Sequence, residues 1–216
     1  MPRQFTGWPA GAFDVLLRLQ GEPARDQRER HRKDREHLVR RPMIALLNDL
    51  ADLDSAYEDF SVWGFQKNHW WWQHQGGIIR MSRNVEISLR FDLDGLHVRG
   101  AWWYPDPAQL ARFRAAVADS GRGDELAGVV ESLKALGYEI TGDVMKRPPR
   151  GFPPDHPRSA LLRHRSLIAE RPLGGGNWIH TAAAVDHVRR TCEDLKPFLS
   201  WLTRHVNDAR PADGLR

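Results

Sequence analysis

The sequence contains a single cysteine, Cys192, among its 216 residues. One thiol cannot form an internal disulfide, which favours a reducing compartment. No apolar run approaches the ~20 residues that a bilayer-spanning helix needs. The N-terminal residues 1–7 lack the apolar core of a signal peptide. We therefore expect a cytoplasmic protein with no membrane partner.

Motifs for metals, cofactors and covalent catalysis are also missing. There is no HExxH pattern, no Cys/His ligand set and no Gly-x-Ser-x-Gly nucleophile turn. Gly174–Gly176 lacks the preceding strand and the following Lys-Ser/Thr of a phosphate-binding loop. His69 and His74 are five residues apart, and the other histidines are scattered. We predict no metal and no cofactor.

Positive charge is present in modest excess but is concentrated in one segment. The formal net charge of the chain is +4. Residues 142–172 hold seven Lys and Arg against three Asp and Glu, a difference of +4 that equals the surplus of the whole chain. Focused charge of this kind favours a local anionic ligand over a broad nucleic-acid footprint.

The middle of the chain shows the pattern of antiparallel strands. Apolar and polar residues alternate with a period of two over 85–92 and again over 96–104. Asp94-Gly95 between them is typical of the two-residue turn that closes a hairpin. Residues 57–65 and 77–81 are further predicted strands, so we expect a central antiparallel sheet.

Helical spacing of apolar residues predicts helices before and after this sheet. We expect them at 9–20, at 25–41 with a continuation from Met43, from Pro107, at 124–136, at 158–165, and from Thr181 to 206. Pro42 should kink the second helix, and Pro197 should bend or divide the last one. The fold class is thus α+β, with helices packed mainly on one face of the sheet and a long C-terminal helix. We expect one domain over 1–206 and a disordered tail over 207–216.

The segment 146–157 combines three cations with five prolines. Proline fixes φ, so a loop of this composition loses little entropy when a ligand binds. Lys146, Arg147 and Arg150 are candidates for binding an anion, because arginine offers a bidentate fork to phosphate or carboxylate. Arg163 and Arg80 are further candidate ligand-binding residues. The alternative is that these cations cap helix C-termini, or pair with Asp155 and Glu170 and only fix the loop.

Asp155 and His156 in the same loop suggest an acid–base pair, because histidine titrates near neutral pH. Neighbouring residues on an extended chain point in opposite directions, so the two side chains need not cooperate. His74 is the other candidate acid–base residue.

Tryptophan is abundant, with nine residues, three of them consecutive at 70–72. Trp71, Trp72 and Trp103 are candidates for an aromatic wall that stacks a planar ligand or base. The same indoles could instead form a contact with a second copy of the chain in a homodimer, since interfaces are rich in tryptophan.

Several motifs resemble one family of bacterial proteins, domain of unknown function 2461. They are residues 95–103, 110–117, 137–140, 146–157 and 161–167, with Trp201-Leu202 and the opening Phe5-Thr-Gly-Trp-Pro. The resemblance implies a single α+β domain and carries no established chemistry. Before Gln75-Gly76, members usually have a stretch rich in Arg, Lys, Asp and Ser that ends in Pro-Tyr-Lys, whereas this chain has tryptophans. If that stretch forms a polar site in the family, the resemblance implies that in this chain the ligand has become flatter and more apolar or the original activity is gone.

Two functional hypotheses follow. In the first, a small anionic, partly aromatic ligand binds in a cleft between loop 146–157 and the Trp-rich segment 69–76, with metal-independent acid–base catalysis left open. In the second, the basic helix 25–41 and exposed tryptophans make a nucleic-acid or protein-interaction module. The two differ in salt dependence, because binding through many phosphates weakens steeply with added salt.

Overall fold

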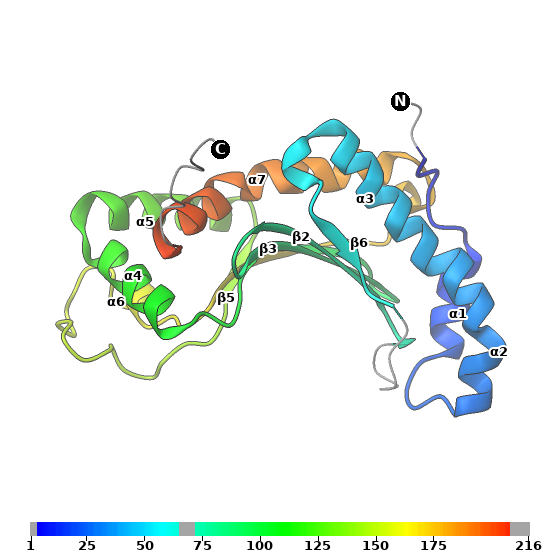
Figure 1. Cartoon of the computed structure of the whole chain (residues 1–216), viewed down its shortest axis with the longest axis horizontal. Helices are drawn as coiled ribbons and strands as arrows, with labels where there is room; N and C mark the ends of the chain where they lie inside the picture. The colour runs from blue at the N-terminus through cyan, green and yellow to red at the C-terminus, as the bar shows by residue number, and fades with distance from the viewer. Residues whose placement is uncertain (1–3, 65–71, 208–216) are drawn as a thin grey trace, which may run out of the picture. The chain divides into compact units, whose positions relative to one another are not determined.

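The computed structural model describes residues 4–64 and 72–207 and has an α+β fold (Figure 1). Its six strands form one antiparallel sheet in the order β1-β2-β3-β4-β6-β5. They are β1 (Phe60–Val62), β2 (Gln75–Ser82), β3 (Val85–Asp92), β4 (Gly95–Trp102), β5 (Glu139–Thr141) and β6 (Leu167–Gly174). The predicted fold class is confirmed.

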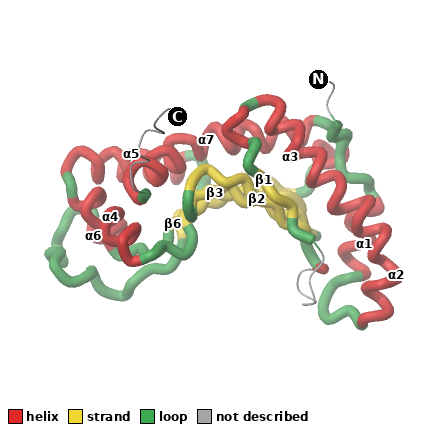
Figure 2. The backbone as a smooth tube through the Cα atoms, in the orientation of Figure 1, coloured by secondary structure: helices red, strands yellow, loops and turns green. Residues whose placement is uncertain are grey.

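Helices, red in Figure 2, come before β1, between β4 and β6, and after β6 along the chain, as the helical spacing predicts. They are α1 (Gly11–Arg18), α2 (Arg25–Arg35), α3 (Arg41–Leu53), α4 (Pro107–Ala118), α5 (Ser120–Ala135), α6 (Ser159–Leu162) and α7 (Ala183–Val206), with short 3-10 turns at Ser55–Tyr57 and Asn177–His180. The long C-terminal helix is confirmed, and Pro197 does not divide it. None of the helices in the described ranges has the length and apolarity to cross a bilayer.

The chain forms two compact units, each of which gathers separate stretches of sequence. Unit 1 comprises residues 1–80, 87–99 and 171–193, and unit 2 comprises 81–86, 100–170 and 194–216. The single domain over 1–206 stays a prediction. Of the tail predicted at 207–216, residues 208–216 lie outside the described residues.

In unit 1, the helices pack against the sheet through apolar side chains. A Cβ added to Gly77 of β2 would lie 3.0 Å from Leu47 Cδ1 of α3, so the helix rests directly on the strand. Trp8 stacks on Phe91 of β3 with ring centroids 4.4 Å apart. Trp8 thereby covers Phe91, one of the alternating apolar residues of β3 that are buried.

The β3–β4 hairpin is confirmed, but its turn lies one residue earlier than predicted. Leu93 and Asp94 form the turn, and Gly95 begins β4 with φ +102°. A Cβ at Gly95 would lie 2.2 Å from the carbonyl carbon of Gly174, so glycine is required both by conformation and by space.

A π-helical turn, Glu36–Arg40, joins α2 to α3. The Arg41 N–H donates to the Glu36 carbonyl, five residues back rather than four. Pro42 explains the wider turn, because in an α-helix its ring would clash with the carbonyl of Leu38. The kink predicted at Pro42 therefore takes the form of one extra residue in the helix.

In unit 2, α4 and α5 meet at a single residue, Asp119. Its N–H donates to Ala115 and ends α4, and its side chain accepts from the Arg122 N–H and caps α5. The helix predicted at 124–136 therefore begins four residues earlier than expected, at Ser120. Glycine is needed at position 123 because the backbone of Val117 lies close to it: a Cβ on Gly123 would lie 2.2 Å from the Val117 carbonyl oxygen.

The core of unit 2 is aromatic. Phe113 of α4 lies between Trp102 of β4 and Trp201 of α7, at centroid distances of 4.9 and 6.1 Å. Trp201 also donates its indole N–H to the Arg122 carbonyl at 2.9 Å. The packing of Phe113 thus joins β4, α4 and α7, and the indole hydrogen bond of Trp201 adds the first turn of α5.

Candidate anion-binding site

A short antiparallel pairing fixes the start of the basic loop in unit 2. Val144 bridges His164. On either side of this bridge, the Met145 N–H donates to the Arg163 carbonyl at 2.8 Å and the Arg165 N–H donates to the Asp143 carbonyl at 2.7 Å. Residues 143–145 and 163–165 are thus held side by side immediately before Lys146.

This pairing brings three guanidinium groups, which we call the Met145 cations, around one methionine. Arg163 donates from Nε to the Met145 carbonyl at 2.6 Å. Arg114 of α4 directs Nη2 at the Met145 sulfur, 3.2 Å away. Arg165 forms an ion pair with Asp143 at 2.8 Å and lies close enough to Arg114 to repel it.

Arg114 is the least compensated of the Met145 cations. Burial and the charge of Arg165 both lower the pKa of Arg114. Its Nε is shielded from solvent without a hydrogen-bond acceptor, and no carboxylate within the described residues pairs with it. Thioether sulfur is only a weak acceptor. A half-buried cation with spare donors is what an anion-binding site provides.

The basic loop continues this positive surface. Figure 2 shows the whole stretch from β5 to the start of α6 as loop. Lys146, Arg147 and Arg150 are exposed, while Pro149 is buried and anchors the loop. In the described part of the chain, none of the three cations forms an ion pair with an acidic side chain. The alternative pairing of these cations with Asp155 or Glu170 is therefore not found there.

Arg158 anchors the far end of the loop on the α4–α5 corner. It donates from Nε to the Val117 carbonyl at 2.7 Å and from Nη2 to the Ala118 carbonyl at 3.1 Å, and it pairs with Asp124. Its side chain is only 11% exposed. The sequence offered no signal for this role, because the position resembles any other arginine near a helix start.

The proposed acid–base pair does not come together in the structure. The His156 Nδ1 accepts the N–H of Arg158 at 3.0 Å, so the ring shapes the turn into α6. Asp155 is exposed and makes no hydrogen bond to His156. His164 is the more buried imidazole of this unit. Burial, with Arg163 nearby, keeps the pKa of His164 below its usual value.

The remaining candidates divide between the two units. Trp103, in unit 2, is half-buried and stacks on Tyr104 with centroids 6.1 Å apart. Arg80, in unit 1, pairs with Asp59 at 3.2 Å. Trp71 lies outside the described residues.

Trp72 and His74, also in unit 1, are held in a buried cluster around Arg35. Arg35 donates to the Trp72 carbonyl at 3.2 Å, the His74 carbonyl at 2.6 Å and the Gln75 side-chain oxygen at 3.2 Å. Burial lowers the pKa of Arg35 to about 10. Arg40 donates to the Trp63 carbonyl at 3.1 Å. The two arginines of the π-turn region therefore hold the chain on both sides of residues 65–71.

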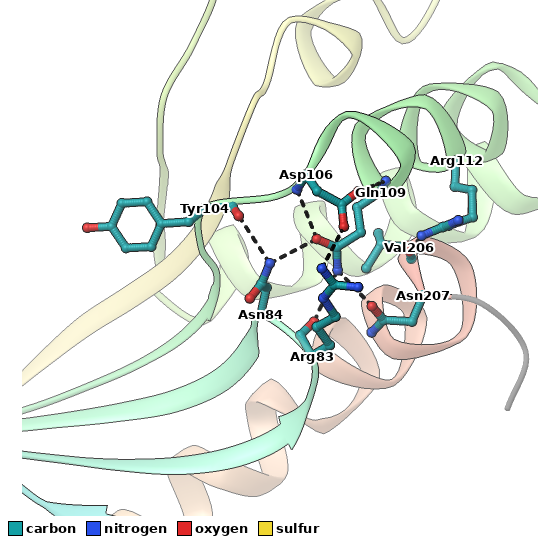
Figure 3. Close-up of polar contacts among 8 residues, drawn as sticks. All are labelled: Arg83, Asn84, Tyr104, Asp106, Gln109, Arg112, Val206 and Asn207. Carbon is teal, nitrogen blue, oxygen red and sulfur yellow. Dashed lines mark hydrogen bonds and ion pairs between the residues drawn. The ribbon is translucent and has the colours of Figure 1, made fainter.

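A second polar cluster joins the β2–β3 turn to α4 and to the end of α7 within unit 2 (Figure 3). Gln109 donates to the Arg83 carbonyl at 3.2 Å and to Asn207 at 2.7 Å, and accepts from Asn84 at 2.9 Å. Asn84 also donates to the carbonyl of Tyr104, at 3.0 Å. Both Asn84 and Tyr104 have positive φ, 62° and 45°. Because the buried Gln109 amide is satisfied, we assign the cluster a structural role.

Asp92, Asp94 and His97 form a group of potential metal ligands among the described residues of unit 1. Asp92 is already engaged, through Oδ1 with His97 at 3.2 Å and through Oδ2 with Arg90 at 2.9 Å. A metal would have to displace both partners. We therefore interpret the group as a charged cross-strand cluster.

Comparison with known proteins gave one match. The model of a family described as "Conserved hypothetical protein (DUF2461)" matches residues 65–201, which include the basic loop, Arg114 and Arg163. A search of curated proteins and a search of solved structures found no match to the chain.

Proposed function

The chain belongs to the DUF2461 family of conserved hypothetical proteins, and we propose that it binds a small anion at the Met145 cations and the basic loop of unit 2. The observation that carries the proposal is Arg114, whose half-buried guanidinium has a spare donor and no acidic partner in the described ranges. Lys146, Arg147 and Arg150 extend the same positive surface to solvent.

Electrostatics supports an anion here over a neutral ligand. Two unit charges about 4 Å apart attract by about 4 kcal/mol at the effective dielectric constant near a protein surface. Arg114 carries a burial cost that no carboxylate in the described residues offsets. An anion would offset that cost, and its oxygen atoms would replace sulfur as acceptors for Arg114. The ligand class is a phosphate or carboxylate compound with at least two oxygens in one plane.

The aromatic part of the predicted ligand has narrower support. Trp103 is the half-buried tryptophan that unit 2 offers for stacking, whereas Trp72 is enclosed with Arg35. The proposal therefore takes the anionic group as its core. It keeps a cytoplasmic location, which the single cysteine favours.

The positive charge of α2, on which the nucleic-acid alternative rests, is compensated in part. Arg30 and Arg32 pair with Asp26 and Glu29 at 2.9 and 3.3 Å, and Arg35 is buried. Paired charges on a helix face release few counterions, so they contribute little to phosphate binding.

Titration with inorganic phosphate, followed by calorimetry, tests the proposal. We expect saturable binding, and we expect the double variant Arg147→Ala/Arg150→Ala to weaken it about tenfold, which corresponds to about 1.4 kcal/mol. The melting temperature should change little because both side chains are exposed. Arg30→Ala on α2 is the matched control and should bind as the wild type does. A double variant with unchanged affinity, or a wild type without saturable binding, refutes the proposal.

A further inference from the structure

The contact between Arg114 and Met145 has a chemical consequence of its own. The sulfur lies 3.2 Å from the Arg114 Nη2, and Met145 is half-buried, so a small oxidant can reach it. The neighbouring Arg114 Nε lacks a hydrogen-bond acceptor. A better acceptor on the sulfur would therefore find unsatisfied donors already in place.

We propose that Met145 is an oxidation site at which conversion to methionine sulfoxide switches off the anion-binding site. The inference rests on the proposed function for its effect, and on the Arg114–Met145 contact for its chemistry. The oxidant is a hydroperoxide. The sulfur lone pair attacks one peroxide oxygen and the O–O bond breaks. The departing oxygen takes up the proton of the transferred oxygen and leaves as water or an alcohol. Sulfur is oxidised by two electrons and the peroxide is reduced by two.

The product changes the acceptor that Arg114 meets. Oxidation turns a weakly accepting, apolar side chain into a polar one with a strongly accepting oxygen. That oxygen takes the guanidinium donors that the anion would use. The anion then loses this half-buried cation while the exposed loop cations remain.

The other described methionines provide controls within the chain. Met43 is fully buried in the core of unit 1 and should resist oxidation while the protein is folded. Met81 is half-buried like Met145, but no arginine donates a hydrogen bond to its sulfur among the described residues. Its oxidation reports exposure alone and should leave phosphate binding unchanged.

The experiment combines peptide mass spectrometry with phosphate titration after graded hydrogen peroxide treatment. Met145 should gain one oxygen while Met43 does not, and phosphate affinity should fall at least fivefold in step with Met145 oxidation. Met145→Gln, which places a polar acceptor on a side chain of similar length, should show the same loss without peroxide. Met145→Leu, which has no sulfur to oxidise, should keep its own starting affinity after peroxide treatment. Methionine sulfoxide reductase should restore the oxidised wild type.

Peroxide-induced loss of affinity in Met145→Leu overturns the inference, as does full affinity in the oxidised wild type. A reduced wild type that never binds phosphate refutes the proposed function instead. The Arg114–Met145 contact is then tested by a double-mutant cycle in which stability is measured by thermal denaturation. Met145→Gln should destabilise the Arg114→Met background more than the wild type, because only the wild type supplies the donor. No coupling in that cycle refutes the contact as the basis of the switch.

Discussion

Arg35 offers the sharpest test of how unit 1 is held together. Replacing Arg35 by methionine keeps an unbranched side chain but removes the donors to Trp72, His74 and Gln75. Each buried acceptor left without a donor costs about 1–3 kcal/mol, so the three together cost about 6. The substitution also removes the cost of burying the charge. The lowering of the Arg35 pKa from 12.5 to about 10 makes that cost about 3 kcal/mol.

The net expectation is a loss of about 3 kcal/mol in the free energy of unfolding, measured by urea denaturation at neutral pH. Arg35→Lys keeps the charge, but one ammonium cannot reach three acceptors, so it should lose about 2 kcal/mol. Arg32→Met, three residues earlier on the exposed face of α2, is the matched control and should change stability by less than about 0.5 kcal/mol. If Arg35→Met loses less than about 1 kcal/mol, the burial cost of the guanidinium balances its hydrogen bonds and the reasoning fails.

Three further predictions concern single residues. Gly123→Ala should lower the free energy of unfolding by about 3 kcal/mol, because the added Cβ meets the Val117 carbonyl and Arg158. Gly128→Ala in the same helix has open space around the added Cβ. It should raise the free energy of unfolding by about 0.5–1 kcal/mol in the same denaturation assay. Burial opposes the ionisation of Asp92, but the hydrogen bond from His97 and the charges of His97 and Arg90 outweigh it and lower its pKa. The folded state therefore releases this proton more readily than the unfolded state, so Asp92 stabilises the fold above its unfolded pKa of 3.8 and stops doing so as pH falls through its lower folded value. Asp92→Asn should cost about 1 kcal/mol near neutral pH, and a cost that persists unchanged in acid would contradict this. Burial raises the pKa of Cys192 to about 12, so iodoacetamide at mildly alkaline pH should modify it only after unfolding, as mass spectrometry can check.

Elements whose signal is local could be predicted from the sequence. The β3–β4 hairpin carries its own period of two and its own turn, so only the turn position was off by one residue. The start of α5 was missed for a tertiary reason. Gly121 and Gly123 look like helix breakers, yet Asp119 caps the helix ahead of them and Gly123 makes room for Arg158.

The candidate site likewise contains residues that the sequence reveals and residues that only the structure reveals. The charge of loop 146–157 is visible in the sequence because its cations are consecutive or nearly so. The role of Arg114 could not be predicted, because Arg114 lies on a helix among other arginines. Its role follows from its contact with Met145, thirty-one residues away in the sequence. Arg35 lies inside a run of charged residues, and such a run by itself indicates a solvent-exposed helix face.

The π-helical turn at Glu36–Arg40 constrains the number of residues in the helical run from α2 to α3. One extra residue rotates all that follows by about 100°, which sets the arginine face of α2 relative to the apolar face of α3. Removing a single residue from the turn would realign the two faces, but Pro42 would then meet a carbonyl oxygen. Deletion and Pro42→Ala are therefore expected to be tolerated better together than the deletion alone. Natural relatives that contain this helical run should then gain or lose that residue and that proline as a pair.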